Sequence, residues 1–296
     1  MISPSLWERA VKIWREAQRR GEKVGRVRFR ELLGVSDTLA RHILFALENR
    51  DVIKVEPAEF RGVQRELVLA DLHIPFHDEY AVQLALDFGE EAGVDTIVLL
   101  GDLVDFYMIS PFRKLRSRKT VGEEVFEARQ FLTNLRERFP DARIILKAGN
   151  HERRLQKFIM TNAPQIEDLV RNLLQDKLNL SAINIEYYEQ PFRIGKLWHL
   201  HGDEKSGRGG NPEYITNVMW KYIHDHFIVG HFHRSQEKIF KKITGEMFWG
   251  GAVGWLGKTL DWAPLNNWTQ GFALVTYDED GNFRAKVYTI IDGRVY

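Results

Sequence analysis

Side chains that can bind metal ions follow several short apolar runs of this 296-residue chain. Each group contains aspartate, asparagine or histidine, and each stands directly after residues that favour a strand. Asn150 is the most informative member, because an amide beside a His-Glu pair has little structural reason to be there. The groups are Asp71-Leu72-His73, Gly101-Asp102, Gly149-Asn150-His151-Glu152, His201-Gly202 and Gly230-His231-Phe232-His233.

Carboxylates and imidazoles in this combination predict a pair of divalent metal ions. A bridging carboxylate holds two such ions roughly 3.5 to 4 Å apart, and the pair activates a shared water and clamps a phosphoryl group. Mixed nitrogen and oxygen ligands suit manganese, with iron, zinc or nickel as alternatives, whereas magnesium alone prefers oxygen. The chain has no cysteine, so disulfides, thiolate ligands and a cysteine nucleophile are all excluded.

The ligand groups fall where predicted strands end. Short apolar runs bounded by glycine indicate strands, and the segments between them have helical periodicity. In an open α/β sheet, ligands gather beyond the carboxyl ends of the strands, so these ends would bring the groups to one rim. The predicted strands span residues 66–70, 96–100, 143–147, 197–200 and 226–229.

From residue 66 onward the chain resembles the calcineurin-like metallophosphoesterase superfamily. The motif series of that superfamily, D-x-H, G-D-x-x-D, G-N-H-E, H-G and G-H-x-H, is present complete and in order. The resemblance implies an α/β fold, with residues 66–296 forming a four-layer α/β/β/α sandwich that hydrolyses phosphoesters.

The resemblance also implies how the ligands divide between two metal ions. Asp102 would bridge the pair, and His151 would be the acid or charge stabiliser at the leaving oxygen, steered by a neighbouring carboxylate. One metal would be bound by Asp71, His73, Asp102 and His233, and the other by Asp102, Asn150, His201 and His231.

The second motif departs from the pattern of the protein phosphatases in this superfamily. There the motif continues with an arginine that holds the phosphate, whereas here Asp105 is followed by Phe106. This difference argues against serine/threonine phosphatase activity, although Arg113 or Arg116 could replace the missing guanidinium. Basic or glycine-rich stretches that could contact substrate phosphates, or simply be solvated surface, span 111–119, 153–157 and 205–212.

Four other histidines are not expected to bind metal. His199 shares a strand face with His201 and is expected to be a satisfied core histidine. His77 could lie near a substrate, whereas His224 and His226 are expected at the surface or at an interface.

The composition indicates a globular protein with one sizeable core and a small additional domain. Hydrophobic residues make up 44% of the chain and charged residues 28%. No run is long and apolar enough to cross a membrane, and the first residues lack the apolar region of a signal peptide. We therefore expect a cytoplasmic protein with no membrane partner.

Residues 1–60 have a different pattern, which resembles a winged helix-turn-helix domain. The first predicted helix has a basic face opposite an apolar face that consists of Leu6, Ala10, Ile13, Trp14 and Ala17. The other predicted elements are a short helix over 29–33 that ends at Gly34, a helix over 37–49, a strand over 51–56 and a linker over 57–65.

Charge favours a nucleic-acid role for this domain. Residues 1–65 carry 14 Lys and Arg against 9 Asp and Glu, a net charge of +5, while the remainder carries 28 against 32, a net of −4. Such asymmetry predicts DNA binding through phosphate contacts. Asp37, at the start of the predicted recognition helix, would repel a phosphate. A protein-contact or dimerisation domain, and hence a homo-oligomer, therefore stays open.

Four further strands are predicted after the last motif. We expect them to be antiparallel and to complete the second sheet of the sandwich. The tryptophan-rich stretch 249–268 is expected to pack in the core and at the rim. The predicted strands span 236–243, 246–253, 271–277 and 283–291, with turns at Thr244-Gly245 and Asp280-Gly281-Asn282.

Taken together, the motifs favour a two-metal-dependent phosphoester hydrolase, specifically a phosphodiesterase or nuclease acting on DNA through residues 1–60 and the basic loops. The first alternative is a phosphomonoesterase for nucleotides or phosphoproteins, in which the N-terminal domain serves oligomerisation or partner binding. The second is a non-enzymatic DNA-binding regulator, against which the complete ligand set argues.

Overall fold

The computed structural model describes residues 4–20, 25–36, 40, 44, 63–110, 119–170, 172–204, 213–258 and 266–296. The chain divides into two compact units, Met1–Lys54 and Val55–Tyr296. No helix within the described ranges has the length and apolar character needed to cross a membrane.

The N-terminal unit contains helices α1 (Pro4–Arg19) and α2 (Arg26–Leu33). Ala10 of α1 is fully buried in one apolar cluster with Phe29 and Leu33 of α2, with Leu6, Ile13 and Trp14 packed against it. This packing confirms the apolar face predicted for the first helix. Most helix stability in proteins comes from packing of an apolar face, so the contact with α2 contributes to the stability of α1.

The second helix is longer than predicted at its start. It begins at Arg26 because Gly25 has an extended backbone and its carbonyl accepts the N–H of Phe29. It ends as predicted at Gly34, whose left-handed φ of 66° suits glycine. Of the predicted helix 37–49 only positions 40 and 44 are described, and the predicted strand 51–56 lies outside the described residues.

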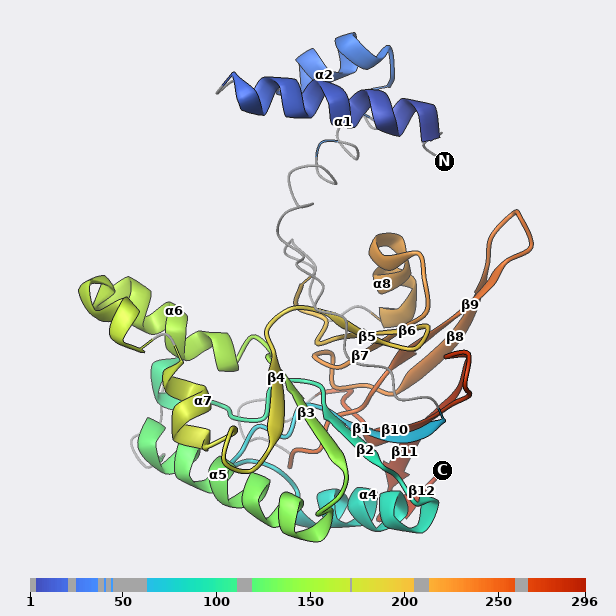
Figure 1. The fold of residues 1–296 in the computed structure, drawn as a ribbon. Coiled ribbons are helices and arrows are strands. Elements are labelled where there is room, and N and C mark those ends of the chain that lie inside the picture. Colours follow the sequence, from blue (N-terminus) through green and yellow to red (C-terminus); the bar gives the residue numbers. More distant parts are fainter. Residues whose placement is uncertain are drawn as a thin grey trace. The chain divides into compact units, whose positions relative to one another are not determined.

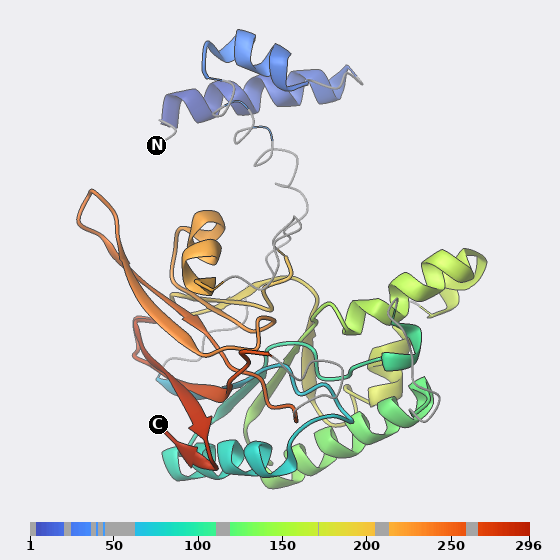
Figure 2. The same cartoon turned by 180° about the vertical axis from the view of Figure 1, so that it is seen from behind.

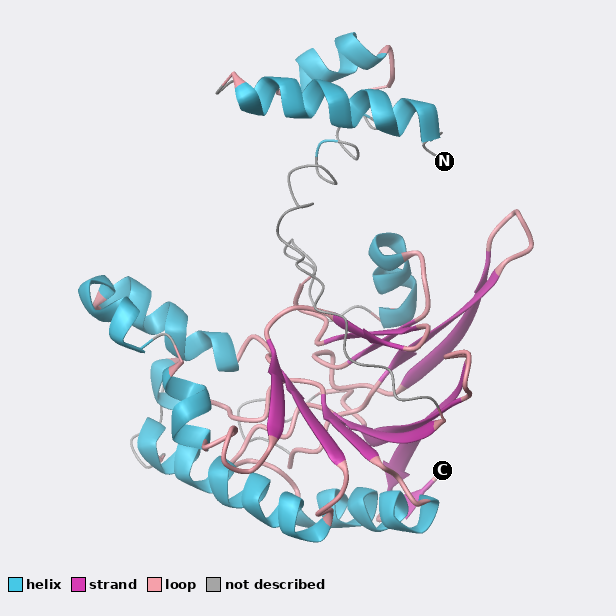
Figure 3. Cartoon of the chain, viewed as in Figure 1, coloured by secondary structure: helices cyan, strands magenta, loops and turns pink. Residues whose placement is uncertain are grey.

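The larger unit is built on two β-sheets (Figure 1; Figure 3). Their strand orders are β12-β11-β10-β1-β2-β3-β4 and β5-β6-β7-β9-β8. The first sheet contains β1 (Gln64–Leu69), β2 (Thr96–Leu99), β3 (Arg143–Lys147), β4 (Ile185–Tyr188), β10 (Gln270–Tyr277), β11 (Phe283–Ile291) and β12 (Arg294–Val295). The second contains β5 (Phe192–Ile194), β6 (Leu197–Leu200), β7 (Phe227–Val229), β8 (Gln236–Lys241) and β9 (Met247–Ala252).

Helices cover the outer faces of both sheets, as Figure 2 shows from behind. Those that pack on the first sheet include α4, α5 and α7, and α8 packs on the second. The helical segments of this unit are α4 (Glu79–Ala92), η1 (Tyr107–Ile109), α5 (Val121–Arg138), α6 (Glu152–Asn162), η2 (Pro164–Val170), α7 (Leu173–Leu178) and α8 (Ile215–Ile223).

Alternation along the central strands produces the layers. Leu67 and Leu69 of β1 join the cluster under the helices, whereas Val68 joins the cluster between the two sheets. Successive strand residues point to opposite faces, so a strand buried on both faces is apolar throughout. The predicted α/β fold with two sheets and outer helices is thereby confirmed.

Two of the four C-terminal strands do not belong to the predicted sheet. Strands β8 and β9 join the second sheet as expected, but β10 and β11 extend the first sheet. The reason is that β10 pairs antiparallel with β1, with Leu67 opposite Leu274, and buries Ala273 between the sheets. An alternating pattern identifies a strand without identifying its neighbour. Strands β4, β5 and β12 were also not predicted.

A buried polar cluster joins the two sheets. His199 Nε2 of β6 lies 2.8 Å from one carboxylate oxygen of Glu66 on β1, and the hydroxyl of Tyr277 on β10 donates to the other at 3.0 Å. The prediction of a core histidine at His199 is therefore confirmed. The expected packing role of the tryptophan stretch holds at Trp249 and Trp255, which are both buried.

Candidate metal centre

The predicted ligands lie in loops that follow strands of both sheets. Strands β1, β2 and β3 are parallel, so the loops that follow them leave one edge of the first sheet. Strands β6 and β7 are parallel in the second sheet and bring their following loops to the same place. The first sheet contributes Asp71, His73, Asp102 and Asn150, and the second contributes His201, His231 and His233.

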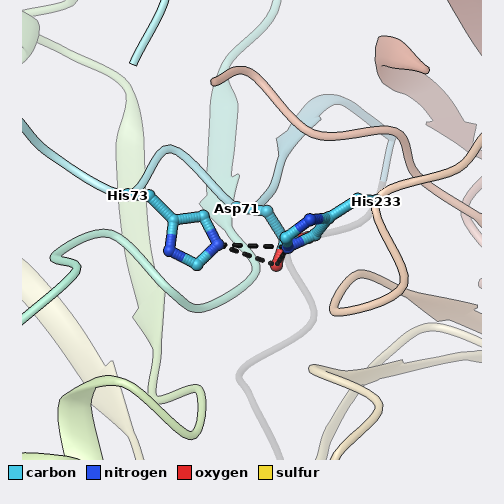
Figure 4. Close-up of side chains that lie close together, drawn as sticks. All are labelled: Asp71, His73 and His233. Atoms are coloured by element: carbon cyan, nitrogen blue, oxygen red, sulfur yellow. Dashed lines mark hydrogen bonds and ion pairs between the residues drawn. The ribbon is translucent and has the colours of Figure 1, made fainter. Parts of the chain in front are cut away.

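One cluster consists of Asp71, His73 and His233, whose potential ligand atoms all lie within 4.8 Å of one another (Figure 4). His233 Nε2 is 3.3 Å from Asp71 Oδ1, and His73 Nε2 is 3.1 Å from His233 Nε2. His73 Nε2 is also 3.9 Å from Asp102 Oδ2. The atoms of this cluster therefore converge on one point beside Asp102.

The second cluster consists of Asp102, His201 and His231. His201 Nε2 lies 3.2 Å from Asp102 Oδ2 and 3.2 Å from the side-chain oxygen of Asn150. Asp102 Oδ2 thus approaches a histidine of each cluster. Its position between them is the one that a bridging ligand needs.

The hydrogen bonds of the two aspartates fit cation binding. Asp71 Oδ2 accepts the N–H of His231 at 2.8 Å, whereas its Oδ1 is buried without a hydrogen-bond partner. Asp102 Oδ1 accepts the N–H of His151 at 2.8 Å, and its Oδ2 faces the clusters. A buried charged oxygen without a partner is costly unless a cation binds it. The donor set therefore fits divalent ions, with one oxygen of each aspartate fixed by the backbone.

Electrostatics keep the carboxylates ionised. Burial favours the neutral acid, but the neighbouring imidazoles overcome it and lower the pKa of Asp71, and still more that of Asp102. Burial opposes charge on His201 as well, yet Asp102 raises its pKa to about 10. The pKa of His233 and that of His231 are lowered, chiefly by burial. Binding of a metal by this set would displace protons, since imidazole ligates when neutral.

Backbone strain is concentrated at these residues. Left-handed backbone is uncommon for residues other than glycine, costs of order 1 kcal/mol or more, and persists where the surroundings enforce it. The candidate ligands with positive φ are Asp71 (55°), His73 (52°), Asp102 (52°), His231 (66°) and His233 (58°). Such clustering is typical of functional sites, and it indicates that the loops are shaped for the position of their side chains.

Comparison with known proteins identifies the family of this chain. The model of the calcineurin-like phosphoesterase family matches residues 65–242, more than half of the chain. The chain belongs to the calcineurin-like phosphoesterase family. It is therefore a metal-dependent phosphoester hydrolase.

Two phage proteins are similar along most of this phosphoesterase. The Gene 54 protein of Mycobacterium phage L5 is 26% identical over 251 residues, which cover 78% of this chain and 95% of that protein. The Gene 54 protein of Mycobacterium phage D29 is 24% identical over 249 residues, with the same coverage.

Solved structures of similar proteins are more distant. Vps29 of Entamoeba histolytica, solved with zinc, is 16% identical, with a TM-score of 0.41 and coverage of 78% of this chain and 96% of that one. The phosphoesterase Yfce of E. coli is 13% identical, with a TM-score of 0.31 and coverage of 75% and 98%.

Glu152 of the phosphoesterase fixes the two central loops. Its carboxylate accepts the N–H groups of Gly149 at 2.7 Å, Leu103 at 2.8 Å, Asp102 at 2.9 Å and Val104 at 3.3 Å. The sequence predicted no role for this residue beyond its motif. Its place in the first turn of α6, three residues after a glycine, was the available signal.

Gly149 is needed for close approach in the same region. A Cβ at this position would lie 2.2 Å from Asp102 Oδ1 and 2.6 Å from the Asp102 nitrogen. Any side chain would therefore displace the bridging candidate.

Glu204 fixes the loop that carries His201. It accepts the N–H groups of Gly202 at 2.7 Å and His201 at 3.1 Å, and it lies 3.0 Å from Nζ of Lys147. Burial favours its neutral form, but Lys147 and His201 outweigh burial and lower its pKa to about 2. Neither Lys147 nor Glu204 was predicted, because Lys147 is a buried charge inside an apolar strand and its partner lies far along the chain.

His151 lies at the edge of both clusters. Its Nδ1 is 2.7 Å from the carbonyl oxygen of Asp105 and 3.4 Å from Asp105 Oδ1, and its Nε2 is 3.7 Å from Asp102 Oδ2. A carbonyl only accepts, so Nδ1 carries the hydrogen and donates it. The neighbouring carboxylate expected from the resemblance is that of Asp105, which also lies 3.1 Å from His73 Nδ1.

The remaining residues that the sequence singled out either lie away from the two clusters or fall outside the described residues. His77 packs against Phe131, and His226 Nδ1 accepts the N–H of Trp249, so neither joins a cluster. His224 ends α8 in a left-handed conformation. The segments 111–118 and 205–212, including Arg113 and Arg116, lie outside the described residues.

Proposed function

We propose that this phosphoesterase is a two-metal phosphodiesterase that cleaves DNA. The main support for this proposal is that two clusters of candidate nitrogen and oxygen ligands meet at Asp102, with His151 beside it. In this proposal, one ion is bound by Asp71, His73, Asp102 and His233, and the other by Asp102, Asn150, His201 and His231. Manganese is the first choice, with iron, zinc or nickel as alternatives, because imidazoles and carboxylates are mixed.

The residues around the clusters would share the chemistry. When bound, a pair of divalent ions polarises a phosphoryl group and activates the attacking water. His151 is the group for the leaving oxygen, because Nδ1 is held by the Asp105 carbonyl and Nε2 lies on the side of Asp102. Glu152 and Glu204 hold the ligand loops by their backbone, so the positions are fixed before substrate binds.

Support for DNA as the substrate comes from the N-terminal unit. Among its residues with described burial, basic side chains predominate on the surface, with Glu16 and Glu31 as exposed acids. The exposed basic residues are Arg9, Lys12, Arg20, Arg26, Arg28 and Arg30. A basic surface of this kind suits phosphate contacts without base readout. We propose that residues 1–60 form a winged helix-turn-helix-like domain that delivers DNA to the phosphoesterase.

The function is tested with metal-loaded full-length protein on labelled single- and double-stranded DNA, beside bis- and mono-nitrophenyl phosphate. We expect cleavage of DNA and faster hydrolysis of the diester than of the monoester. Hydrolysis of the monoester alone would favour the phosphomonoesterase alternative, which retains the same ligand set.

The role of the N-terminal unit is tested by deletion of residues 1–60. Every proposed ligand lies at or beyond Asp71, so hydrolysis of the small diester should stay near the wild-type rate. DNA affinity should fall and depend less on salt, because each lost phosphate contact removes roughly 0.9 from the log-log slope on duplex DNA. An unchanged slope together with a changed oligomeric state would favour a homo-oligomerisation domain.

A further inference from the structure

Arg154 is the guanidinium closest to His151 in the described part of the chain. It lies in the first turn of α6, and its side chain turns back toward the site. Its Nη1 donates to the carbonyl of Asp105 at 2.7 Å, and its Nη2 donates to His151 Nε2 at 2.9 Å. His151 Nε2 is in turn 3.7 Å from Asp102 Oδ2, so the guanidinium stands at the edge of the two clusters.

The charge of Arg154 has no direct carboxylate partner among the described residues. Its neighbour Arg153 differs, because Arg153 forms an ion pair with Asp203. Arg143 and Arg138 are likewise paired, with Glu186 and with Asp87. Arginine has five N–H donors in a fixed fork, so Arg154 retains donors beyond those that bond Asp105 and His151. A guanidinium of this kind, half-buried and unpaired at a phosphoesterase centre, is suited to an anion.

Arg154 also contacts the segment in which the second motif departs from the protein-phosphatase pattern. Phe106 stands where protein phosphatases of the superfamily have their phosphate-holding arginine. Arg154 Nη1 bonds the backbone of this same segment, at Asp105 and, at 3.5 Å, at Phe106. A guanidinium from α6 therefore contacts the backbone of this segment, whereas the Phe106 side chain is buried in the core.

We propose that Arg154 binds a non-bridging oxygen of the substrate phosphoryl group, and that it exchanges its bond to His151 Nε2 for this contact. The proposal rests on the proposed two-metal function of the same site. Arginine binds phosphate oxygens through charge-assisted hydrogen bonds, which are stronger than a bond to a neutral ring nitrogen. The exchange frees the lone pair of His151 Nε2, which must take up a proton before the ring can deliver one to the leaving oxygen.

The test uses inorganic phosphate as the probe of the metal-loaded full-length protein. Arg154→Met and Arg154→Lys are compared with wild type for phosphate inhibition, for kcat and KM on bis-nitrophenyl phosphate, and for metal content. We expect the inhibition constant for phosphate to rise roughly 10- to 100-fold in Arg154→Met, the range of a charged hydrogen bond. Arg154→Lys should recover part of this loss, and both variants should keep the wild-type metal content.

Arg284→Met is the matched control for loss of one arginine. Arg284 is exposed. It lies opposite Thr276 where β11 pairs with β10, and Thr276 lies opposite Arg65 where β10 pairs with β1. Arg65 is at the start of β1, the end that is away from Asp71. Its kinetic constants should match wild type. An unchanged phosphate inhibition constant in Arg154→Met, with altered kcat alone, would overturn the proposal and leave Arg154 as a positioning residue for His151. A wild-type protein that binds metal but hydrolyses no ester would instead refute the proposed function together with this inference.

Discussion

The two sheets contribute different chemistry to the same centre. The loops of the first sheet supply Asp71, Asp102 and Asn150, which are the candidate oxygen ligands, together with His73. The loops of the second sheet supply imidazoles, namely His201, His231 and His233. The cluster of Asp71 and the cluster of His201 each draw on both sheets. Neither sheet can therefore hold a metal pair alone, and the packing between the sheets is a condition for the site.

The loops of the two sheets are also held in place by different contacts. Glu152 holds the first-sheet loops by accepting backbone N–H groups at Asp102 and Gly149. Glu204 holds the second-sheet loop at His201, but it also needs Lys147, which is fully buried on β3 of the first sheet. The first support stays within the loops of one sheet, whereas the second joins the two sheets. Substitutions in the two halves should consequently have different effects.

The largest expected effect is that of the bridging candidate. Asp102→Asn should reduce turnover to background and lower the content of both metals, because both proposed sites lose a charged ligand. His231→Ala should also abolish turnover but affect mainly one metal, because the second-sheet imidazole belongs to one cluster. Elemental analysis and hydrolysis of bis-nitrophenyl phosphate measure both. Two full equivalents of metal in an active Asp102→Asn protein would contradict the assignment.

The next effect separates chemistry from metal binding. His151→Ala should keep both metals and lose roughly 10² to 10⁴ in rate, the usual range for a lost acid-base group. Esters with good leaving groups should lose less, because their leaving oxygen needs little assistance. Rates on nitrophenyl esters and on DNA are compared in the same preparation. Equal losses on both substrates would show that His151 does not assist the leaving oxygen.

Substitution of Glu152 and substitution of Glu204 compare the loops of the two sheets most directly. Glu152→Gln should lower metal affinity about 10- to 100-fold, the range for groups that orient ligands, with a small change in stability. Glu204→Gln should lower the free energy of unfolding by roughly 3 kcal/mol, because it leaves the buried Lys147 without its charged partner. Metal titration and denaturant unfolding measure the two quantities.

A double-mutant cycle isolates the contribution of the buried lysine. Lys147→Met combined with Glu204→Gln should cost less stability than the sum of the single changes, because no buried charge is then left unpaired. Strict additivity would show that Glu204 supports the loop by its backbone contacts alone.

The sequence predicted the parts of this molecule that have local or ordered signals. The strands before Asp71, Asp102, Asn150, His201 and His231 were recognisable because each is a short apolar run followed by a glycine or a polar residue. The motif order then indicated which of these ends meet, and the structure places the corresponding ligand atoms within contact distance. The overall arrangement of helices and two sheets could be predicted in the same way.

The rest depends on contacts that leave no local signal. The sheet membership of β10 was missed because pairing of Leu67 with Leu274 is decided by neighbours far away in the sequence. Lys147 resembled an exposed strand residue, and only its partner at position 204 explains its burial. Arg154 belonged to a basic stretch whose members look alike until the fold pairs Arg153 with Asp203 and leaves Arg154 at His151.

The smallest predicted effect concerns Glu124, whose pKa shifts in the opposite direction to that of Glu204. Burial is outweighed at Glu204, whose pKa falls to about 2, whereas burial and then Asp105 raise the pKa of Glu124 to about 7. Glu124 is fully buried on α5, where it accepts the N–H of Tyr107 and leaves its second oxygen without a hydrogen-bond partner. Arg154 lowers the pKa of Glu124, but burial and Asp105 have the larger effect, and no ion pair within the described residues matches that of Glu204 with Lys147.

The raised pKa of Glu124 lowers the stability of the protein as pH rises. Between the ordinary glutamate pKa of 4.5 and about 7, folded Glu124 holds more of its proton than the unfolded chain does. Stability from this group is consequently present at low pH and is lost as pH rises through about 7. In Glu124→Gln the metal-free protein should lose less unfolding free energy between about pH 5 and pH 8, by roughly 1 to 3 kcal/mol. Denaturant unfolding of both metal-free proteins across this range is the measurement, and parallel pH curves would show that Glu124 does not titrate there.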